Sequence, residues 1–176
     1  PPARFVPIVR SHHRERKARR PTGLGSCTQI HFVDNRVMVG GNEWLSGAEL
    51  DGFRALAVRR HFPARATLFV EGDDPYDVML IESGDVKLTT MSLAGGELVL
   101  DVVGAGGLLG DLSALDGGQR SATAVALTAV EVTSMSAGTF REFLHGSKDA
   151  THAMLRSTVT RLRQAYRREL EYSRQD

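Results

Sequence analysis

The chain has little of the chemistry that small proteins use to bind redox centres or membranes. It contains one cysteine, Cys27, among 176 residues. A single thiol forms no disulfide within the chain and cannot supply the four ligands of an iron–sulfur cluster. The apolar runs fall well short of the roughly 18 to 20 residues that a membrane-spanning helix needs. The first residues also lack the apolar core of a signal peptide, so we expect a cytoplasmic protein without membrane contact.

Excess charge and aromatic residues are also scarce. The chain has 22 Lys and Arg against 21 Asp and Glu, and only 6% of its residues are aromatic. Such a balance creates no field that would draw the whole protein to nucleic acid. A basic segment at 10–21 contains no aromatic side chain for stacking on bases. We therefore interpret residues 1–45 as an irregular basic N-terminal arm with a short hairpin at 30–39, and an arm that contacts nucleic-acid phosphates is the alternative.

Short apolar runs separated by turn residues fill the segment 46–146. The runs are often alternating or β-branched, which predicts strands over 66–72, 77–84, 85–92, 96–103, 121–127 and 129–136. Evenly spaced short strands of this kind are typical of an antiparallel barrel or jelly roll. The flanking segments 46–56 and 137–144 have helical spacing instead. We predict a mainly β fold, an antiparallel β-roll or jelly roll (double-stranded β-helix) flanked by short helices.

The segment 147–176 contains neither Gly nor Pro and predicts one long helix. Its apolar stripe has spacings of 4, 3, 4 and 4, through Leu155, Val159, Leu162, Tyr166 and Leu170. So narrow a stripe suits contact with another helix better than docking on a broad core. Arg161 and Arg163 flank it. We predict a homodimer through residues 153–172, and packing against the same domain is the alternative.

The segment 104–126 is the one that indicates a ligand. Its glycine-rich beginning lets the backbone approach a bound molecule closely, and the free amides of a short helix at 111–116 favour an anion. Arg120 and Ser121 could both reach one phosphate. The carboxylate of Asp111 could accept a hydrogen bond from a ribose 2′-hydroxyl. The alternative is a hairpin loop in which Arg120 merely pairs with Asp111 or Asp116.

The stretch LGDLSALDGGQRSATAVAL at 109–127 resembles the phosphate-binding cassette of the cyclic-nucleotide-binding domain in the cyclic-AMP receptor protein (CRP/FNR) family of bacterial transcription regulators. The stretch LFVEGDDPYDVMLIESGDVKLT at 68–89 is similar to the first strands of that family. The resemblance extends over residues 46–176. It implies a β-roll at 46–146, a dimerisation helix at 147–176 and a cyclic nucleotide as ligand, with cyclic AMP as the first candidate.

The resemblance also implies the ligand-binding residues, which are Gly110, Asp111, Leu112, Ser113, Arg120, Ser121 and Leu100. In that arrangement Arg120 pairs with the cyclic phosphate and Ser121 donates to it. Asp111 stands where the family usually has a Glu that bonds the ribose 2′-hydroxyl. Leu100 is an apolar wall for the base. Ala165 and Tyr166 stand where family members that respond to cyclic AMP carry hydroxyl residues, so the choice of base is open.

Regulators of this family continue into a helix-turn-helix domain, and the 176 residues stop before it. We therefore expect DNA contact only through a domain absent from this chain. The alternative function is a degenerate module that dimerises or binds a partner without nucleotide. In the segment 46–146 only His61 and His145 could serve as imidazole ligands, and both are expected in or beside helices at its edges. We assign no catalytic residue, no metal site and no cofactor.

Overall fold

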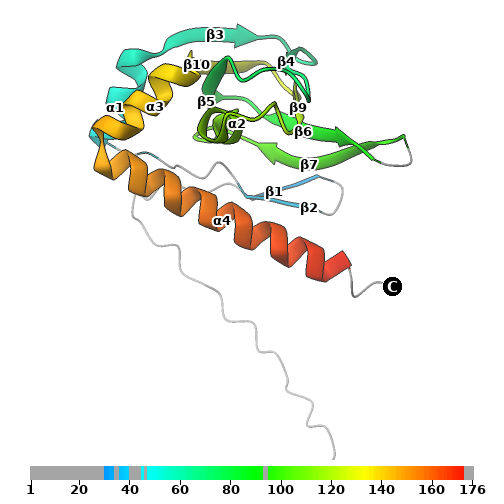
Figure 1. Ribbon diagram of the computed structural model, residues 1–176. Coiled ribbons are helices and arrows are strands. Elements are labelled where there is room, and N and C mark those ends of the chain that lie inside the picture. The colour runs from blue at the N-terminus through cyan, green and yellow to red at the C-terminus, as the bar shows by residue number, and fades with distance from the viewer. Residues whose placement is uncertain (1–29, 34–35, 40–44, 46, 93–94, 173–176) are drawn as a thin grey trace, which may run out of the picture.

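The fold is built from two four-stranded antiparallel sheets that face each other (Figure 1). The computed structural model describes residues 30–33, 36–39, 45 and 47–172 except 93–94. One sheet has the order β3 (Val58–Phe62), β10 (Val130–Ser136), β5 (Asp77–Ser83) and β8 (Leu108–Leu109). The other has the order β4 (Thr67–Phe69), β9 (Thr123–Ala126), β6 (Val86–Met91) and β7 (Glu97–Val103). The predicted fold class is confirmed.

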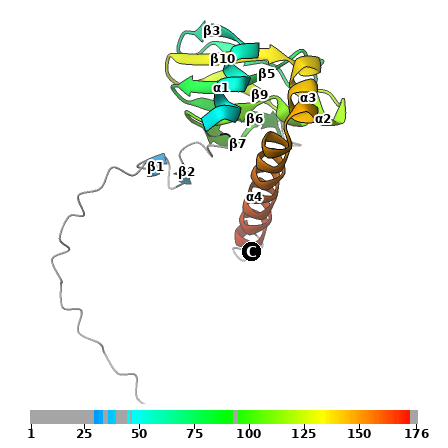
Figure 2. The ribbon, with the colours of Figure 1, turned by 90° about the vertical axis from the view of Figure 1, so that its left-hand side faces the viewer.

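Four helices accompany the roll, α1 (Gly47–Leu56), α2 (Asp111–Asp116), α3 (Ala137–Gly146) and α4 (Lys148–Tyr172). Ser136 caps α3, because its side chain accepts from the amide of Thr139. Ser147 begins the long helix in the same way, with its Oγ 3.1 Å from the amide nitrogen of Ala150. From there α4 runs away from the roll (Figure 2). No helix of the described residues combines the length and apolarity needed to cross a membrane.

Within residues 1–45 the structure describes a small hairpin and Leu45, which is buried in the core beneath the helices. The strands of the hairpin, β1 (Ile30–Val33) and β2 (Arg36–Val39), pair antiparallel with Ile30 opposite Val39. The predicted strand pairing at 30–39 is therefore confirmed. Residues 1–29, 34–35 and 40–44 of the arm predicted at 1–45 lie outside the described residues.

Strand β5 is buried on both faces, and its sequence is therefore a continuous apolar run at its centre. Met79 and Ile81 face the core between the two sheets, whereas Val78 and Leu80 face a second core beneath the helices. Successive side chains of a strand point to opposite faces, so one strand serves both cores. The helical core also contains Ala114 of α2. Helix α2 therefore packs against α3, the helix that precedes α4.

Two strands were not expected from the sequence. The strand β3, with the sequence VRRHF, lies at a sheet edge and is exposed at four of its five residues, so it has no alternating apolar face. The two-residue β8 is too short to produce a pattern. The expectation that His61 lies in or beside a helix is wrong, because it lies on β3 and pairs with Glu131 of β10 in the strand register.

An ion pair ties α1 to the roll and makes stability depend on pH. Arg54 donates to both carboxylate oxygens of Glu82, at 2.9 and 2.5 Å, and Thr133 donates to the same carboxylate at 3.0 Å. The hydrogen bond from Arg54 holds the pKa of Glu82 below its ordinary value. This stabilisation is complete above the pKa of the unfolded-state carboxyl and is lost as the pH falls through the lower folded-state pKa.

We therefore expect Glu82→Gln to lower the free energy of unfolding at neutral pH by about 1 kcal/mol. The loss of stability on acidification should also become shallower, because the variant has no carboxylate to protonate there. Urea denaturation at a series of pH values measures both effects. Glu142→Gln, on the exposed side of α3, is the matched control and should leave the acid profile as in the wild type. An unchanged acid profile in Glu82→Gln would contradict the assignment.

Candidate functional site

The segment that the sequence singles out connects β8 to β9 and contains α2. Gly110 precedes α2 with φ +78° and Gly117 follows it with φ +75°. Glycine adopts this left-handed conformation without the steric cost that other residues incur. The amide of Gly117 donates to the carbonyl of Ser113 and closes the last turn. The predicted short helix at 111–116 is confirmed, and two glycines set its ends.

Gly110 is needed for space as well as for its backbone conformation. A Cβ at this position would overlap with Nη1 of Arg120 and would lie 2.9 Å from the carbonyl oxygen of Asp77. The Arg120 side chain therefore packs directly on the backbone where α2 begins. This contact brings the loop before β9 and the start of α2 into one cluster.

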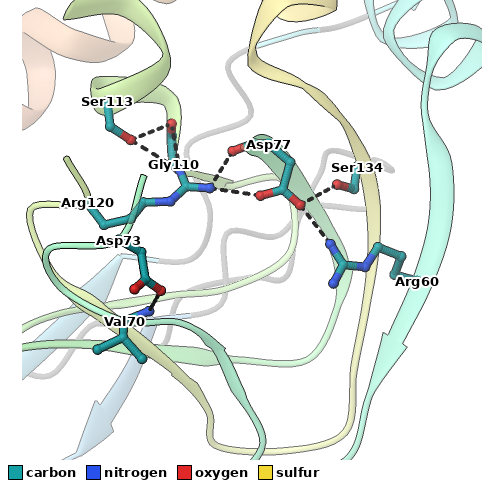
Figure 3. A network of polar contacts seen from close by, with 8 residues as sticks. All are labelled: Arg60, Val70, Asp73, Asp77, Gly110, Ser113, Arg120 and Ser134. Carbon is teal, nitrogen blue, oxygen red and sulfur yellow. Dashed lines mark hydrogen bonds and ion pairs between the residues drawn. The ribbon is translucent and has the colours of Figure 1, made fainter. Parts of the chain in front are cut away.

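The Arg120 guanidinium lies at the centre of that cluster (Figure 3). Its side chain is 2% exposed. Nη1 donates to the carbonyl of Gly110 at 3.1 Å and to Oγ of Ser113 at 3.2 Å. Nη2 donates to the carbonyl of Asp77 at 2.7 Å and to Oδ1 of Asp77 at 2.8 Å. The alternative in which Arg120 pairs with Asp111 or Asp116 is wrong, because its carboxylate partner is Asp77 of β5.

One donor of Arg120 is left over. Its Nε is buried and finds no hydrogen-bond acceptor among the described residues. The guanidinium carbon also lies 4.4 Å from the ring centroid of Phe69, which favours a cation. Burial lowers the pKa of Arg120, and the charge of Asp77 opposes that shift. A buried unpaired donor is costly, so the arrangement fits an additional acceptor, such as an anion, at Nε.

Asp111, the first residue of α2, is 2% exposed and faces the long helix. Both of its oxygens accept from Arg161 of α4, with Nη2 donating to Oδ2 and Nη1 lying 3.3 Å from Oδ1. This paired geometry is the strong form of an arginine–carboxylate contact. Nε of Arg161 is likewise buried and meets no acceptor in the described part of the chain. The pair connects the start of α2 to a point midway along α4.

The sequence places Arg161 beside the apolar stripe and does not identify it as a site residue. Asp111 and Arg161 are 50 positions apart, and no spacing pattern links two residues at that separation. The signal available in the sequence was only that Arg161 flanks the apolar stripe, as Arg163 also does. Only the tertiary structure, which brings Arg161 of α4 to Asp111 of α2, identifies the pair.

The seven predicted site residues divide into two groups. The structure brings Gly110, Ser113 and Arg120 into one hydrogen-bonded cluster, with Asp111 next to them in sequence and turned toward α4. Leu112 is 46% exposed and Ser121 is also exposed. Leu100 lies on β7 in the other sheet and is 39% exposed. The cluster therefore holds Gly110, Ser113 and Arg120 of the predicted phosphate end, whereas Ser121, also predicted there, and Leu100, predicted beside the base, lie outside it.

Known proteins resemble this chain in both sequence and structure. The model of the cyclic nucleotide-binding domain matches residues 59–147. The cyclic AMP receptor protein of Thermus thermophilus is 31% identical over 121 residues, which are 69% of this chain and 56% of that protein. The chain thus spans about half the length of this curated relative.

Solved structures show the same relationship. The catabolite activator protein of Thermus thermophilus superposes with a TM-score of 0.66 at 30% identity, covering 73% of this chain and 61% of that one. The N-terminal domain of a transcriptional regulator from Streptomyces coelicolor gives a TM-score of 0.56 at 34% identity, covering 69% and 85%. With the two-sheet roll, the glycine-bounded helix α2 and the buried Arg120 in place, these matches show that the chain belongs to the cyclic-nucleotide-binding domain family, on the branch of the cyclic-AMP receptor protein type.

Proposed function

We propose that this chain is the cyclic-nucleotide-sensing regulatory domain of a CRP/FNR-type transcription regulator, with cyclic AMP as the first candidate ligand. The observation that carries the proposal is the Arg120 guanidinium, buried at the start of α2 with its Nε donor unpaired among the described residues. A planar guanidinium in a nearly water-free site suits a phosphate better than any neutral ligand. The names of two similar proteins, a cyclic AMP receptor protein and a catabolite activator protein, agree with such a role.

In this proposal the ligand lies along the segment 109–121. The cyclic phosphate contacts Arg120, with Ser121 and the amides of Gly110 and Leu112 as further donors, and Ser113 holds the guanidinium. Asp111 accepts from the ribose 2′-hydroxyl. Leu100 covers one side of the base. Because Asp111 already accepts from Arg161, the ribose must share that carboxylate with α4, which connects the ligand to the long helix.

Calorimetric titration of the chain with cyclic AMP and with cyclic GMP tests the proposal. We expect at least one of them to bind with a Kd in the micromolar range, and the ratio of the two Kd values defines the base preference. The competing function is a degenerate module that dimerises or binds a partner without nucleotide. Absence of heat with both ligands, in protein that is folded by circular dichroism, would favour that competitor.

The proposal includes a homodimer formed through residues 153–172 of α4. The stripe of that helix is exposed throughout, with Leu155 at 61%, Val159 at 39%, Leu162 at 50%, Tyr166 at 58% and Leu170 at 60%. By contrast, Ala153 and Met154 are buried in the helical core. A long apolar stripe left in water is a strong reason for helices to associate.

We expect Leu162→Glu to convert the dimer into a monomer, because the carboxylate would be placed in an apolar helix–helix contact. Sedimentation equilibrium should then give half the mass of the wild type. Thr160→Glu, which adds the same charge on α4 beside the stripe, is the control and should remain dimeric. A monomeric wild type at micromolar concentration would contradict the dimer.

We assign DNA contact to a region outside these 176 residues, since the chain spans about half of the curated relative. We assign no catalytic step and no cofactor to the chain, and we place the protein in the cytoplasm.

A further inference from the structure

The Arg120 guanidinium is already occupied by the protein at each of its terminal N–H groups. Nη1 donates to the carbonyl of Gly110 and to Oγ of Ser113, and Nη2 donates to the carbonyl and the carboxylate of Asp77. An arginine has five N–H donors in a fixed planar fork, so Nε alone is left. A phosphate that binds through a pair of N–H groups must therefore displace one protein acceptor.

The planar fork determines which acceptor has to yield. The N–H of Nε shares an edge of the guanidinium with Nη2, and Nη2 is the nitrogen that Asp77 holds. A phosphate that takes the free Nε donor together with its neighbour thus meets Asp77. The carboxylate of Asp77 and the phosphate carry charge of the same sign, and at hydrogen-bond distance they oppose each other.

Asp77 has other partners that can hold it when Arg120 turns to a ligand. Its Oδ2 accepts from Nη1 of Arg60 at 2.7 Å and from Oγ of Ser134 at 3.0 Å (Figure 3). Arg60 belongs to the edge strand β3, and its side chain is 42% exposed. The carboxylate therefore lies between two guanidinium groups, one buried at the site and one at the surface.

We infer that Asp77 is an internal competitor of the cyclic phosphate for Arg120, and that Arg60 weakens this competition by drawing the carboxylate outward. The inference rests on the proposed function and concerns how tightly the same site binds. In the free protein Asp77 occupies the donor that the ligand needs, so the measured affinity is the intrinsic affinity reduced by the fraction of molecules in which Arg120 is released.

The test compares cyclic-AMP binding by calorimetry in the wild type, Asp77→Asn, Arg60→Gln and the double variant. Asn keeps an acceptor for Arg120 and a group for Ser134 but removes the charge, so binding should become about tenfold tighter. Arg60→Gln should weaken binding about threefold, because Asp77 then depends more on Arg120. The double variant should bind like Asp77→Asn, since Arg60 acts only through Asp77.

Opposite signs in the two single variants are the diagnostic result. A purely structural role of the network would weaken binding in both, and thermal unfolding of each variant reports its stability separately. Asp74→Asn is the matched control, because Asp74 is exposed and the hydrogen bonds of the Arg60 and Arg120 guanidinium groups do not include its carboxylate. The Kd of this control should differ from that of the wild type by less than about threefold, as expected for an exposed charge.

Equal or weaker binding by folded Asp77→Asn would overturn the inference. If that variant does not fold, an unchanged Kd in folded Arg60→Gln would overturn it equally. Either result would leave the proposed function intact, provided that the wild type binds cyclic AMP and Arg120→Lys does not. If neither the wild type nor Asp77→Asn binds cyclic AMP or cyclic GMP, the proposed function and this inference both fail.

Discussion

Replacement of Arg120 by Lys is expected to weaken cyclic-nucleotide binding about 100-fold, because about 3 kcal/mol of charge-assisted hydrogen bonding is lost. Lysine keeps the positive charge but has no planar fork, so it cannot present two parallel N–H groups to a phosphate. It also cannot serve Gly110, Ser113 and Asp77 together, as the guanidinium does. Calorimetric titration of wild type and variant under identical salt conditions measures the change.

The lysine variant is preferred to Arg120→Ala for a structural reason. Alanine would remove the hydrogen bonds of a buried guanidinium and its contact with Phe69, at a cost of about 3 kcal/mol of stability. Loss of binding would then be confused with loss of fold. Arg59→Lys, on the exposed strand β3, is the matched control and should bind as the wild type does. Wild-type affinity in Arg120→Lys would show that the phosphate does not bind at Arg120.

Gly110→Ala is expected to lower the free energy of unfolding by about 3 kcal/mol and to abolish nucleotide binding. The φ of +78° is strained for alanine by about 1 to 2 kcal/mol. The added methyl group would also overlap with Nη1 of Arg120, and overpacking of this kind costs about 1 to 3 kcal/mol. Relief of the overlap requires Arg120 to move, so the ligand would lose its main cation. Urea denaturation and calorimetry on the same protein measure the two effects.

Gly117→Ala supplies a matched control at the other end of α2. Its φ of +75° imposes nearly the same backbone strain, but a Cβ there meets no described atom within 4 Å. We therefore expect a loss of only about 1 kcal/mol and a Kd close to that of the wild type. The difference between the two variants isolates the contact between Gly110 and Arg120. Equal losses in both would show that this contact is looser than the structure has it.

Local patterns in the sequence predicted most of the roll. Six strands and the helices α2 and α3 agree with their predicted segments, because short-range alternation and turn residues act within each segment. The strand β3 was missed because an edge strand with exposed Arg59 and Arg60 has no apolar face to reveal it. The predicted domain boundaries and ligand-binding roles stay predictions.

The candidate site divides in the same way. The glycine-bounded helix and the nearby Arg120 and Ser121 are contiguous in sequence, so their pattern was readable and matched a known family. The ion-pair partners of Arg120 and Asp111 could not be predicted from the sequence. Asp77 is 43 positions from Arg120, and Arg161 is 50 positions from Asp111. Spacing rules describe neighbours on one element and carry no information across such distances.

The sequence by itself therefore determined the elements of the roll, the glycine-bounded turn around α2 and the charged residues near it. The tertiary structure alone decided which opposite charge each of those residues meets. The physical reason is burial: folding encloses Arg120 and Asp111 where water cannot solvate them, and a buried charge requires a partner from whatever element packs against it. For Arg120 that partner comes from β5, and for Asp111 it comes from α4.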